Sequence, residues 1–335
     1  MSKEFPPPPL APEEPYDLEA EHPELFDLEY ISQLVEARIE SHTVIHCSKN
    51  NDGTLEKYLI KYHSENADFY ATTNTNYQMQ PSFKNQQALH AQMPDQTIPR
   101  PITFLKDNST VIYQELVGEN FADFLQHKPE AEQLKCFQKA GMLLKQLHQV
   151  DMASMNTATN TSNTSLENIM SSINHNAFAE IEEVEPEFSH RLKALYEKII
   201  AYEAGILAEA ELVATHGDFH PKNLIIKKDN NAGMVDFTEV SVSVKGRDIG
   251  GFLEQTYAIL KHQGLANEDL IEHFQASFLE GYGDNIKPDD TEVRFYQSWQ
   301  AWRNAMYNAV MRPPVMEDAE EFLTRAEEHF ANVSQ

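Results

Sequence analysis

Three polar side chains, drawn from one short stretch of the chain, have types and a spacing that could do chemistry. Asp218 and Asn223 enclose four residues and stand just before Leu224–Ile226, an apolar run typical of a short buried strand. After an Asn- and Gly-containing turn, a second short strand, Met234–Val235, ends on Asp236. Such a hairpin puts Asn223 at the entry of one strand and Asp236 at the exit of the next. We therefore expect both side chains to face one cleft beside Asp218.

This trio suits phosphoryl transfer. One carboxylate can orient an attacking hydroxyl and accept its proton, while an amide and a second carboxylate supply hard oxygen ligands for the magnesium that bridges nucleotide phosphates. Asp218 and Asn223 also have the spacing of the catalytic loop of protein kinases. The alternative is a solvated turn, because Asp and Asn are common in turns. The joint pattern favours Asp218 as the catalytic base and Asn223 and Asp236 as metal ligands.

The run His216-Gly-Asp-Phe-His-Pro-Lys-Asn223, followed by Asp236, resembles the aminoglycoside phosphotransferase and choline kinase family, whose motif is His-Gly-Asp-x-His-x-x-Asn with a metal-binding Asp farther on. The segment from Gly246 to Leu253 resembles that family's Gly-Asp-Pro-x-x-Asp-Leu-Ala segment. The resemblance implies an α+β, two-lobed, protein-kinase-like fold with a small N-terminal antiparallel sheet and a larger, mainly helical C-terminal lobe. It also implies ATP- and Mg²⁺-dependent phosphorylation of a small-molecule hydroxyl.

Length and composition are compatible with this class of protein. A chain of 335 residues can form two domains or one two-lobed unit. It has no apolar run of the roughly 18–20 residues that a membrane span needs, and its proline-rich, acidic beginning is unlike a signal peptide. Only Cys47 and Cys136 occur, which fits reduced thiols. We expect a cytoplasmic protein that is not bound to a membrane.

The net charge of −27 argues against a nucleic-acid partner, because phosphate contacts need clustered Lys and Arg. Acidic residues attract a cationic substrate and raise its encounter rate. The alternative is that the acidic excess serves only solubility. A cationic small-molecule acceptor is therefore one of two interpretations of the charge.

We expect three regions along the chain. Residues 1–22 are rich in Pro, Glu and Asp and cannot bury enough apolar surface to fold alone, so they should form a disordered or loosely docked arm. Residues 23–116 should form the nucleotide-binding lobe, beginning with a short helix from Phe26 to Val35. Residues 117–335 should form the catalytic and substrate-binding lobe.

The N-terminal lobe should begin its sheet with three strands, Ala37–Ser41, Thr43–Cys47 and Lys57–Tyr62. Alternation in the third run places Lys61 on the face opposite the run's buried residues. In the family resemblance, Lys61 occupies the position of the strand lysine that binds the α- and β-phosphates. The alternative is an ordinary surface lysine.

Two features depart from the family pattern. The chain has no glycine before the turn of the expected hairpin, so the phosphates would have to be covered by Ser41 and Thr43 through hydroxyls or backbone amides. A predicted helix over 82–92 offers Gln86 or Gln87 where a Glu partner for the strand lysine is expected. A neutral amide pairs with Lys more weakly than a carboxylate does.

The segment that links the lobes follows a predicted strand over 110–114. The resemblance implies that the backbone at Glu115 and Val117 hydrogen-bonds the adenine of the nucleotide, and that Gly118 allows the chain to bend. From sequence alone the same segment is only a strand, a turn and a helix start.

The C-terminal lobe should be mostly helical, with an amphipathic helix over 130–150. An Asn-, Thr- and Ser-rich tract at 156–165 predicts a loop, followed by helices over 166–176 and 188–210. In the resembled family this insert helps form the acceptor site.

The final region, 249–335, should be helical and rich in aromatic residues. Trp299 and Trp302 lie three apart on one helix face, as core residues or as a wall for an ammonium group through cation–π contact. We expect His148 to be a packing residue and Asp248 to brace the catalytic loop.

Two other functions stay open. A kinase-like binding or scaffold protein that has lost turnover would explain the missing glycine loop and helix Glu. A metallohydrolase using His216, Asp218 and His220 is the other, but Gly217 and Pro221 disfavour the helix that would bring its two histidines together.

Overall fold

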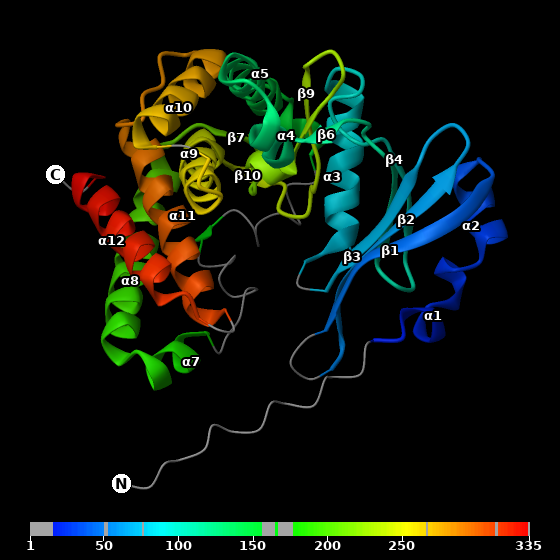
Figure 1. Ribbon diagram of the computed structural model, residues 1–335, viewed down its shortest axis with the longest axis horizontal. Helices are drawn as coiled ribbons and strands as arrows, with labels where there is room; N and C mark the ends of the chain where they lie inside the picture. The colour runs from blue at the N-terminus through cyan, green and yellow to red at the C-terminus, as the bar shows by residue number, and fades with distance from the viewer. Residues whose placement is uncertain are drawn as a thin grey trace, which may run out of the picture.

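The computed structural model has a sheet-containing lobe and a helical lobe, which lie side by side in Figure 1. The structure describes residues 16–49, 53–75, 77–155, 165–166, 177–265, 267–311 and 314–333. The predicted two-lobed α+β fold is confirmed. Among the described helices, none combines the length and the apolar character needed to cross a membrane.

The N-terminal lobe is a five-stranded antiparallel sheet of order β1-β2-β3-β5-β4. Its strands are β1 (Ile39–Lys49), β2 (Leu55–Ser64), β3 (Phe69–Asn74), β4 (Pro101–Leu105) and β5 (Thr110–Gln114). Its helices are α1 (Leu18–Glu21), η1 (Pro23–Leu25), α2 (Leu28–Val35) and α3 (Met79–Gln92). Helix α3 stands between the sheet and the helical lobe (Figure 1).

Alternation along β2 separates two chemical faces. Tyr58, Ile60 and Tyr62 are fully buried and pack with the residues of α1 and α2 in one apolar cluster. Lys57 and Lys61 therefore belong to the opposite face, because successive side chains of a strand point to opposite sides. The prediction for the face of Lys61 is confirmed.

The predicted break after Ser41 is wrong, because β1 is one continuous strand from Ile39 to Lys49. No Gly or Pro interrupts this run, so nothing ends the strand. Register shifts between Ile39 and Ser41 and between Val44 and His46 absorb its irregularity.

The expected N-terminal arm lies only partly among the described residues. Residues 1–15 are outside them. Within the rest, α1 begins after the cap Asp17, whose carboxylate accepts the N–H of Ala20, and Leu18 is buried. Residues 16–22 thus pack onto the sheet lobe.

The C-terminal lobe is built mainly of helices, with two small sheets at its border with the other lobe. Its helices are α4 (Phe121–His127), α5 (Glu130–His148), η2 (Met152–Ser154), α7 (Ala177–Val184), α8 (Pro186–Glu209), η4 (Pro221–Asn223), α9 (Lys245–His262), α10 (Glu268–Tyr282), α11 (Thr291–Val310) and α12 (Met316–Val333). Its strands are β6 (Glu119–Asn120), β7 (Leu212–Thr215), β8 (Leu224–Ile226), β9 (Ala232–Met234) and β10 (Ser241–Val244). The helices predicted over 130–150 and 188–210 are confirmed, whereas 156–164 and 167–176 lie outside the described residues.

Aromatic side chains fill the core of this lobe. Trp299 and Trp302 stack on each other with ring centroids 5.2 Å apart, and both are buried. The indole N–H of Trp302 donates to the carbonyl of Leu192 at 2.8 Å. The core interpretation of the tryptophan pair is therefore confirmed.

A buried ion pair joins the last helix to the lobe. Arg325 of α12 makes two hydrogen bonds, of 2.9 and 2.8 Å, to the fully buried carboxylate of Glu254 in α9. Burial alone would raise the pKa of Glu254, but the hydrogen bonds from Arg325 and the imidazole of His329, 3.4 Å away, outweigh it and lower the pKa to about 2. Helix α12 is thus held by a bidentate, charge-assisted contact.

We predict that Arg325→Met lowers the free energy of unfolding by about 3–5 kcal/mol, because it removes both hydrogen bonds of the guanidinium and leaves the buried Glu254 charge with His329 alone. In the wild type, the depressed pKa stabilises the fold above the ordinary glutamate pKa of about 4.3, and this contribution is lost as the pH falls towards 2. Urea unfolding between pH 7 and pH 3 measures both effects. The matched control is Arg191→Met, which removes the more exposed pairs with Glu320 and Glu327 and should cost about 0–1 kcal/mol. Equal losses for the two variants would contradict the assignment.

Candidate active site

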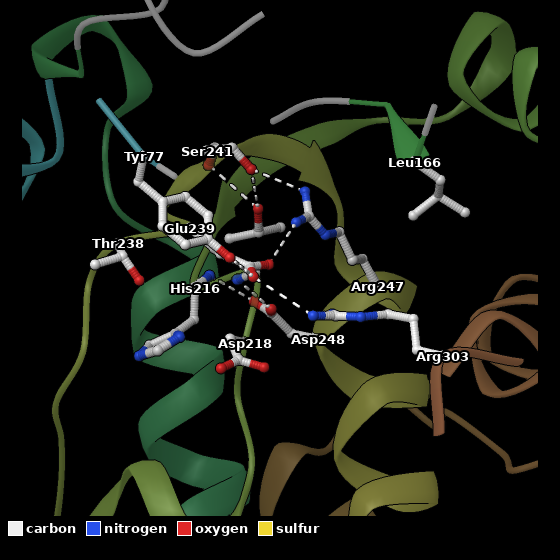
Figure 2. A network of polar contacts seen from close by, with 12 residues as sticks. Tyr77, Leu166, His216, Asp218, Thr238, Glu239, Ser241, Arg247, Asp248 and Arg303 are labelled. Carbon is white, nitrogen blue, oxygen red and sulfur yellow. Dashed lines mark hydrogen bonds and ion pairs between the residues drawn. The ribbon is translucent and has the colours of Figure 1, made fainter. Parts of the chain in front are cut away.

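The loop that carries Asp218 is fixed by a buried carboxylate. Asp248, in the first turn of α9, accepts the backbone N–H groups of His216 and Gly217, each at 2.8 Å (Figure 2). The side chain of Asp248 is fully buried. The carboxylate therefore satisfies two consecutive amides, which is the bracing role predicted for it.

His148 supports this carboxylate from α5. Its Nε2 lies 3.0 Å from the Oδ2 of Asp248, and its Nδ1 lies 2.9 Å from the hydroxyl of Tyr282 in α10. Burial alone would raise the pKa of Asp248, but the contact with His148 and the amide of His216 outweigh it and keep the pKa below its ordinary value. A charged brace thus connects three helices with the catalytic loop.

Asp218 and Asn223 lie in direct contact. The Nδ2 of Asn223 donates to the carbonyl oxygen of Asp218 at 2.9 Å and to its Oδ2 at 3.2 Å. The Nε2 of His220 lies 3.3 Å from the same Oδ2, and its Nδ1 accepts the backbone N–H of Lys222. Because Nδ1 accepts, the proton of the neutral ring is on Nε2 and faces Asp218.

Sequence analysis did not identify Arg303 of α11, whose buried guanidinium extends towards Glu239 (Figure 2). Its Nη2 lies 3.5 Å from Glu239, which also accepts the hydroxyl of Tyr77 at 2.7 Å and lies 3.4 Å from Arg247. Burial alone would raise the pKa of Asp218. The contact with His220 and the nearby positive charge of Arg303 outweigh the effect of burial and hold this pKa well below its usual range. The sequence signal that could have identified Arg303 was a charged residue within a helix rich in aromatic residues.

Asp236 follows β9 and has a left-handed backbone, with φ of 62°. A non-glycine residue pays a strain cost there, and such residues cluster at functional sites. Its Oδ1 accepts the hydroxyl of Thr238 at 2.8 Å, and its Oδ2 lies 3.8 Å from the Nζ of Lys57. The carboxylate is thus oriented from both lobes.

Asn223 and Asp236 line one cavity of about 180 Å³ between the lobes. Its remaining lining residues come from the sheet, α3 and the segment after β9: Lys57, Leu59, Thr72, Met79, Ser82, Phe83, Gln86, Pro99, Val111, Tyr113, Val235, Phe237 and Thr238. Since Asn223 also contacts Asp218, the structure brings the predicted trio together.

These residues fit a magnesium ion. Asn223 uses its Nδ2 in the hydrogen bonds to Asp218, which leaves its Oδ1 as a donor to a cation. Asp236 supplies carboxylate oxygens at the same cavity. Mg²⁺ is bound in proteins by one or two such oxygen ligands together with water and substrate phosphates.

The structure places Lys61 outside this cavity's lining. Its Nζ lies 2.9 Å from both Asp68 and Glu115. Burial would lower the pKa of Lys61, but the hydrogen bonds to Glu115 and Asp68 outweigh it and raise the pKa above its ordinary value. The hydroxyl of Tyr70 also donates to Glu115, at 3.1 Å. Phosphate binding by Lys61 stays a prediction.

The predicted phosphate cover lies beside Lys61. Ser41 and Thr43 are inside β1, where they pair with His63 and Lys61, and the Oγ1 of Thr43 lies 3.1 Å from the Nε2 of His63. Ser41 and Thr43 therefore lie towards one end of the β1–β2 hairpin, whereas Lys57, the β2 residue near Asp236, pairs with Ser48 towards the other end. Their contact with phosphates stays a prediction.

The predicted adenine-binding segment connects the lobes. The backbone N–H of Glu115 donates to the carbonyl of Asp68 at 2.8 Å, and the side chain of Val117 is exposed. Glu115 and Val117 line a second cavity, of about 420 Å³. Gly118 is required by close packing, because a Cβ there would lie 2.4 Å from the side chain of Ile225.

Comparisons with known proteins place the chain among phosphotransferases. A family profile described as the phosphotransferase enzyme family matches residues 73–296, which include the whole trio. No curated protein sequence matches the chain.

Solved structures share the fold at low identity. The spectinomycin phosphotransferase APH(9)-Ia, in complex with ADP and spectinomycin, is 15% identical, with 92% of this chain and 98% of that chain covered and a TM-score of 0.60. The ethanolamine kinase of Plasmodium vivax is 14% identical, with 90% and 85% covered and a TM-score of 0.58. APH(2'')-IIa, in a ternary complex with streptomycin and ATP, is 15% identical, with 92% and 97% covered and a TM-score of 0.59.

Gly217→Ala tests how tightly the loop before Asp218 is held. Gly217 has φ of 85°, and an added Cβ would lie 2.4 Å from the carbonyl oxygen of Glu239. We expect a loss of at least about 2 kcal/mol in the free energy of unfolding, measured by urea denaturation. The control Gly205→Ala, in α8 with open space around it, should stabilise the protein by about 0.5–1 kcal/mol. A neutral Gly217→Ala variant would show that the loop is not constrained.

Proposed function

The chain belongs to the phosphotransferase enzyme family, and on that premise we propose that it transfers a phosphoryl group from MgATP to a hydroxyl of a small molecule. The observation that carries the proposal is that Asn223 and Asp236 line one interlobe cavity while Asn223 also contacts Asp218. Hard oxygen ligands next to a carboxylate are what phosphoryl transfer requires.

Asp218 acts mainly by orientation. With its pKa well below the ordinary value, it is ionised throughout the physiological range and accepts a hydrogen bond from the acceptor hydroxyl. A weakly basic carboxylate is sufficient, because the transition state of phosphoryl transfer is loose and the proton leaves late. His220 and Asn223 hold the carboxylate of Asp218 in place.

Asn223 and Asp236 would hold the magnesium, which neutralises charge on the nucleotide phosphates when bound. The left-handed backbone of Asp236 and its hydrogen bond from Thr238 direct the carboxylate before any ligand arrives. Such preorganisation spares the enzyme the cost of ordering these groups during the reaction.

The acceptor is a small hydroxylated molecule, as are the spectinomycin and streptomycin bound by solved structures of this fold. The net charge of −27 favours the approach of a cationic acceptor. The buried guanidinium of Arg303, next to Asp218 and Glu239, disfavours an ammonium group beside the reacting hydroxyl. We therefore expect any cationic group of the acceptor to lie away from Arg303.

A second candidate is a nucleotide-independent scaffold. The observation that favours it is that the ammonium group of Lys61 is paired with two carboxylates, Asp68 and Glu115. Calorimetric titration of the wild type with MgATP separates the two functions. Binding in the micromolar to millimolar range supports the kinase, and absence of binding at millimolar nucleotide supports the scaffold.

Asp218→Asn should lower kcat by roughly 10²- to 10⁴-fold, because the amide cannot accept the hydroxyl proton. MgATP affinity and thermal stability should stay near those of the wild type. The measurement is phosphate transfer to an acceptor found by a thermal-shift screen of aminoglycosides and hydroxylated metabolites. Asp229→Asn, in the exposed turn of the β8–β9 hairpin, is the control and should leave turnover unchanged. Wild-type turnover in Asp218→Asn would exclude Asp218 from the reaction.

Asp236→Asn should raise the magnesium concentration needed for half-maximal ATP binding by roughly 10-fold or more, because a carboxylate ligand is replaced by a neutral amide. Calorimetric titration with ATP at several Mg²⁺ concentrations measures the shift. The affinity for adenosine, which carries no phosphate, serves as the internal control and should not change. An unaltered Mg²⁺ dependence would remove Asp236 from the metal site.

A further inference from the structure

Two lysines share the cleft face of β2 and differ in what surrounds them. Lys57 and Lys61 are four residues apart on the same side of the strand, which separates their Cα atoms by about 13 Å. Leu59 lies between them and lines the interlobe cavity together with Lys57. Position along one strand therefore decides which ammonium group can reach the metal-binding end of the cleft.

Lys61 belongs to the end of the sheet that leads into the interlobe connection. It pairs across the sheet with Tyr70, which pairs in turn with Tyr113 near the end of β5. Its ammonium group is held by Asp68 and Glu115 at 2.9 Å each. A phosphate drawn to Lys61 would approach these two carboxylates, and their repulsion would cancel the attraction.

Lys57 belongs to the opposite end. Its Nζ lies 3.8 Å from Oδ2 of Asp236, and it lines the same cavity as Asn223 and Asp236. Within the part of the chain that the structure describes, Asp236 is the residue with which Lys57 forms an ion pair. The side chain is about one-third exposed, so it is open to a ligand in the cleft.

Among the described residues, helix α3 and strand β3 offer no acidic partner for a lysine at this end. Helix α3 contains no Asp or Glu, and the amide of Gln86 donates to the carbonyl of Pro99 at 3.1 Å. Strand β3 contains no lysine, and Thr72 is its contribution to the cavity. Helix α3 thus lacks the Glu that the family pattern expects, and the counterion of Lys57 is instead Asp236, across the cleft.

We propose that Lys57, and not Lys61, is the lysine that binds the nucleotide phosphates, and that Asp236 is its counterion until they bind. When Mg²⁺ and phosphate bind, the ion pair between Lys57 and Asp236 would be replaced by two contacts. The Asp236 carboxylate would hold the metal, and the Lys57 ammonium group would bind the phosphate oxygens. Lys61 remains with Asp68 and Glu115 and holds the connection between the lobes. This inference rests on the proposed function.

The test compares Lys57→Gln with the matched variant Lys61→Gln by calorimetric titration. The ligands are MgATP, ATP without magnesium, and adenosine. Lys57→Gln should weaken both forms of ATP by roughly 10- to 100-fold and leave adenosine unchanged, because a charge-assisted hydrogen bond to phosphate is lost. Lys57→Arg should recover most of the affinity, since the charge is kept. Lys61→Gln should weaken MgATP less than about 3-fold.

Thermal unfolding of both variants, with Lys61→Arg as a charge-preserving replacement, checks that the lobe is folded. ATP affinity near that of the wild type in Lys57→Gln, or a large loss confined to Lys61→Gln, would overturn the assignment while leaving the proposed function intact. A wild type that binds neither MgATP nor ATP would overturn the proposed function and this inference with it. The two failures are therefore distinguishable.

Discussion

The hydrogen bonds between the Asp248 carboxylate and two consecutive backbone amides are the constraint on which the site depends. The amides of His216 and Gly217 both donate to this one buried carboxylate, and the chain turns at Gly217, with φ of 85°, into Asp218. Removal of a charged acceptor from such a pair leaves buried donors unsatisfied, which costs more than the bond itself contributes. His148 keeps the carboxylate ionised and in place.

A second constraint joins the lobes. The hydroxyl of Tyr77 donates to Glu239, and that of Ser82 donates to the carbonyl of Thr238 at 3.1 Å. Both contacts attach the beginning of α3 to the segment that follows Asp236. The wall of the interlobe cavity that α3 forms is thus attached to the segment after Asp236, and a shift of α3 would move that segment with it.

Much of the site was predictable because its signals are local. The apolar run after Asn223, the turn that begins at Asp229 and the short strand before Asp236 predict the hairpin without any knowledge of distant residues, and the structure has it. The face of Lys61 followed from strand alternation alone. The choice between Lys57 and Lys61 did not, because it depends on the register of β2 against β3 and on the distance to Asp236, which lies far along the chain.

Other features needed the tertiary structure for the same reason. The continuity of Ile39–Lys49 was missed because the polar residue at position 42 interrupts the apolar pattern although nothing ends the strand. Arg303 acquires its role only through contact with Glu239 and proximity to Asp218, and no short-range pattern records such a contact. Local chemistry predicted the catalytic loop, and long-range packing decided which charges face it.

In the proposed function, Asn223 and Asp236 together bind one divalent cation at the phosphate end of a nucleotide that reaches Asp218. The most direct measurement is a crystal structure with ADP and Mn²⁺, in which anomalous scattering locates the metal. We predict one metal peak within about 2.0–2.6 Å of oxygens from both Asn223 and Asp236, with nucleotide phosphate oxygens among its other ligands. A metal bound elsewhere, or a nucleotide bound away from these two residues, would contradict the account.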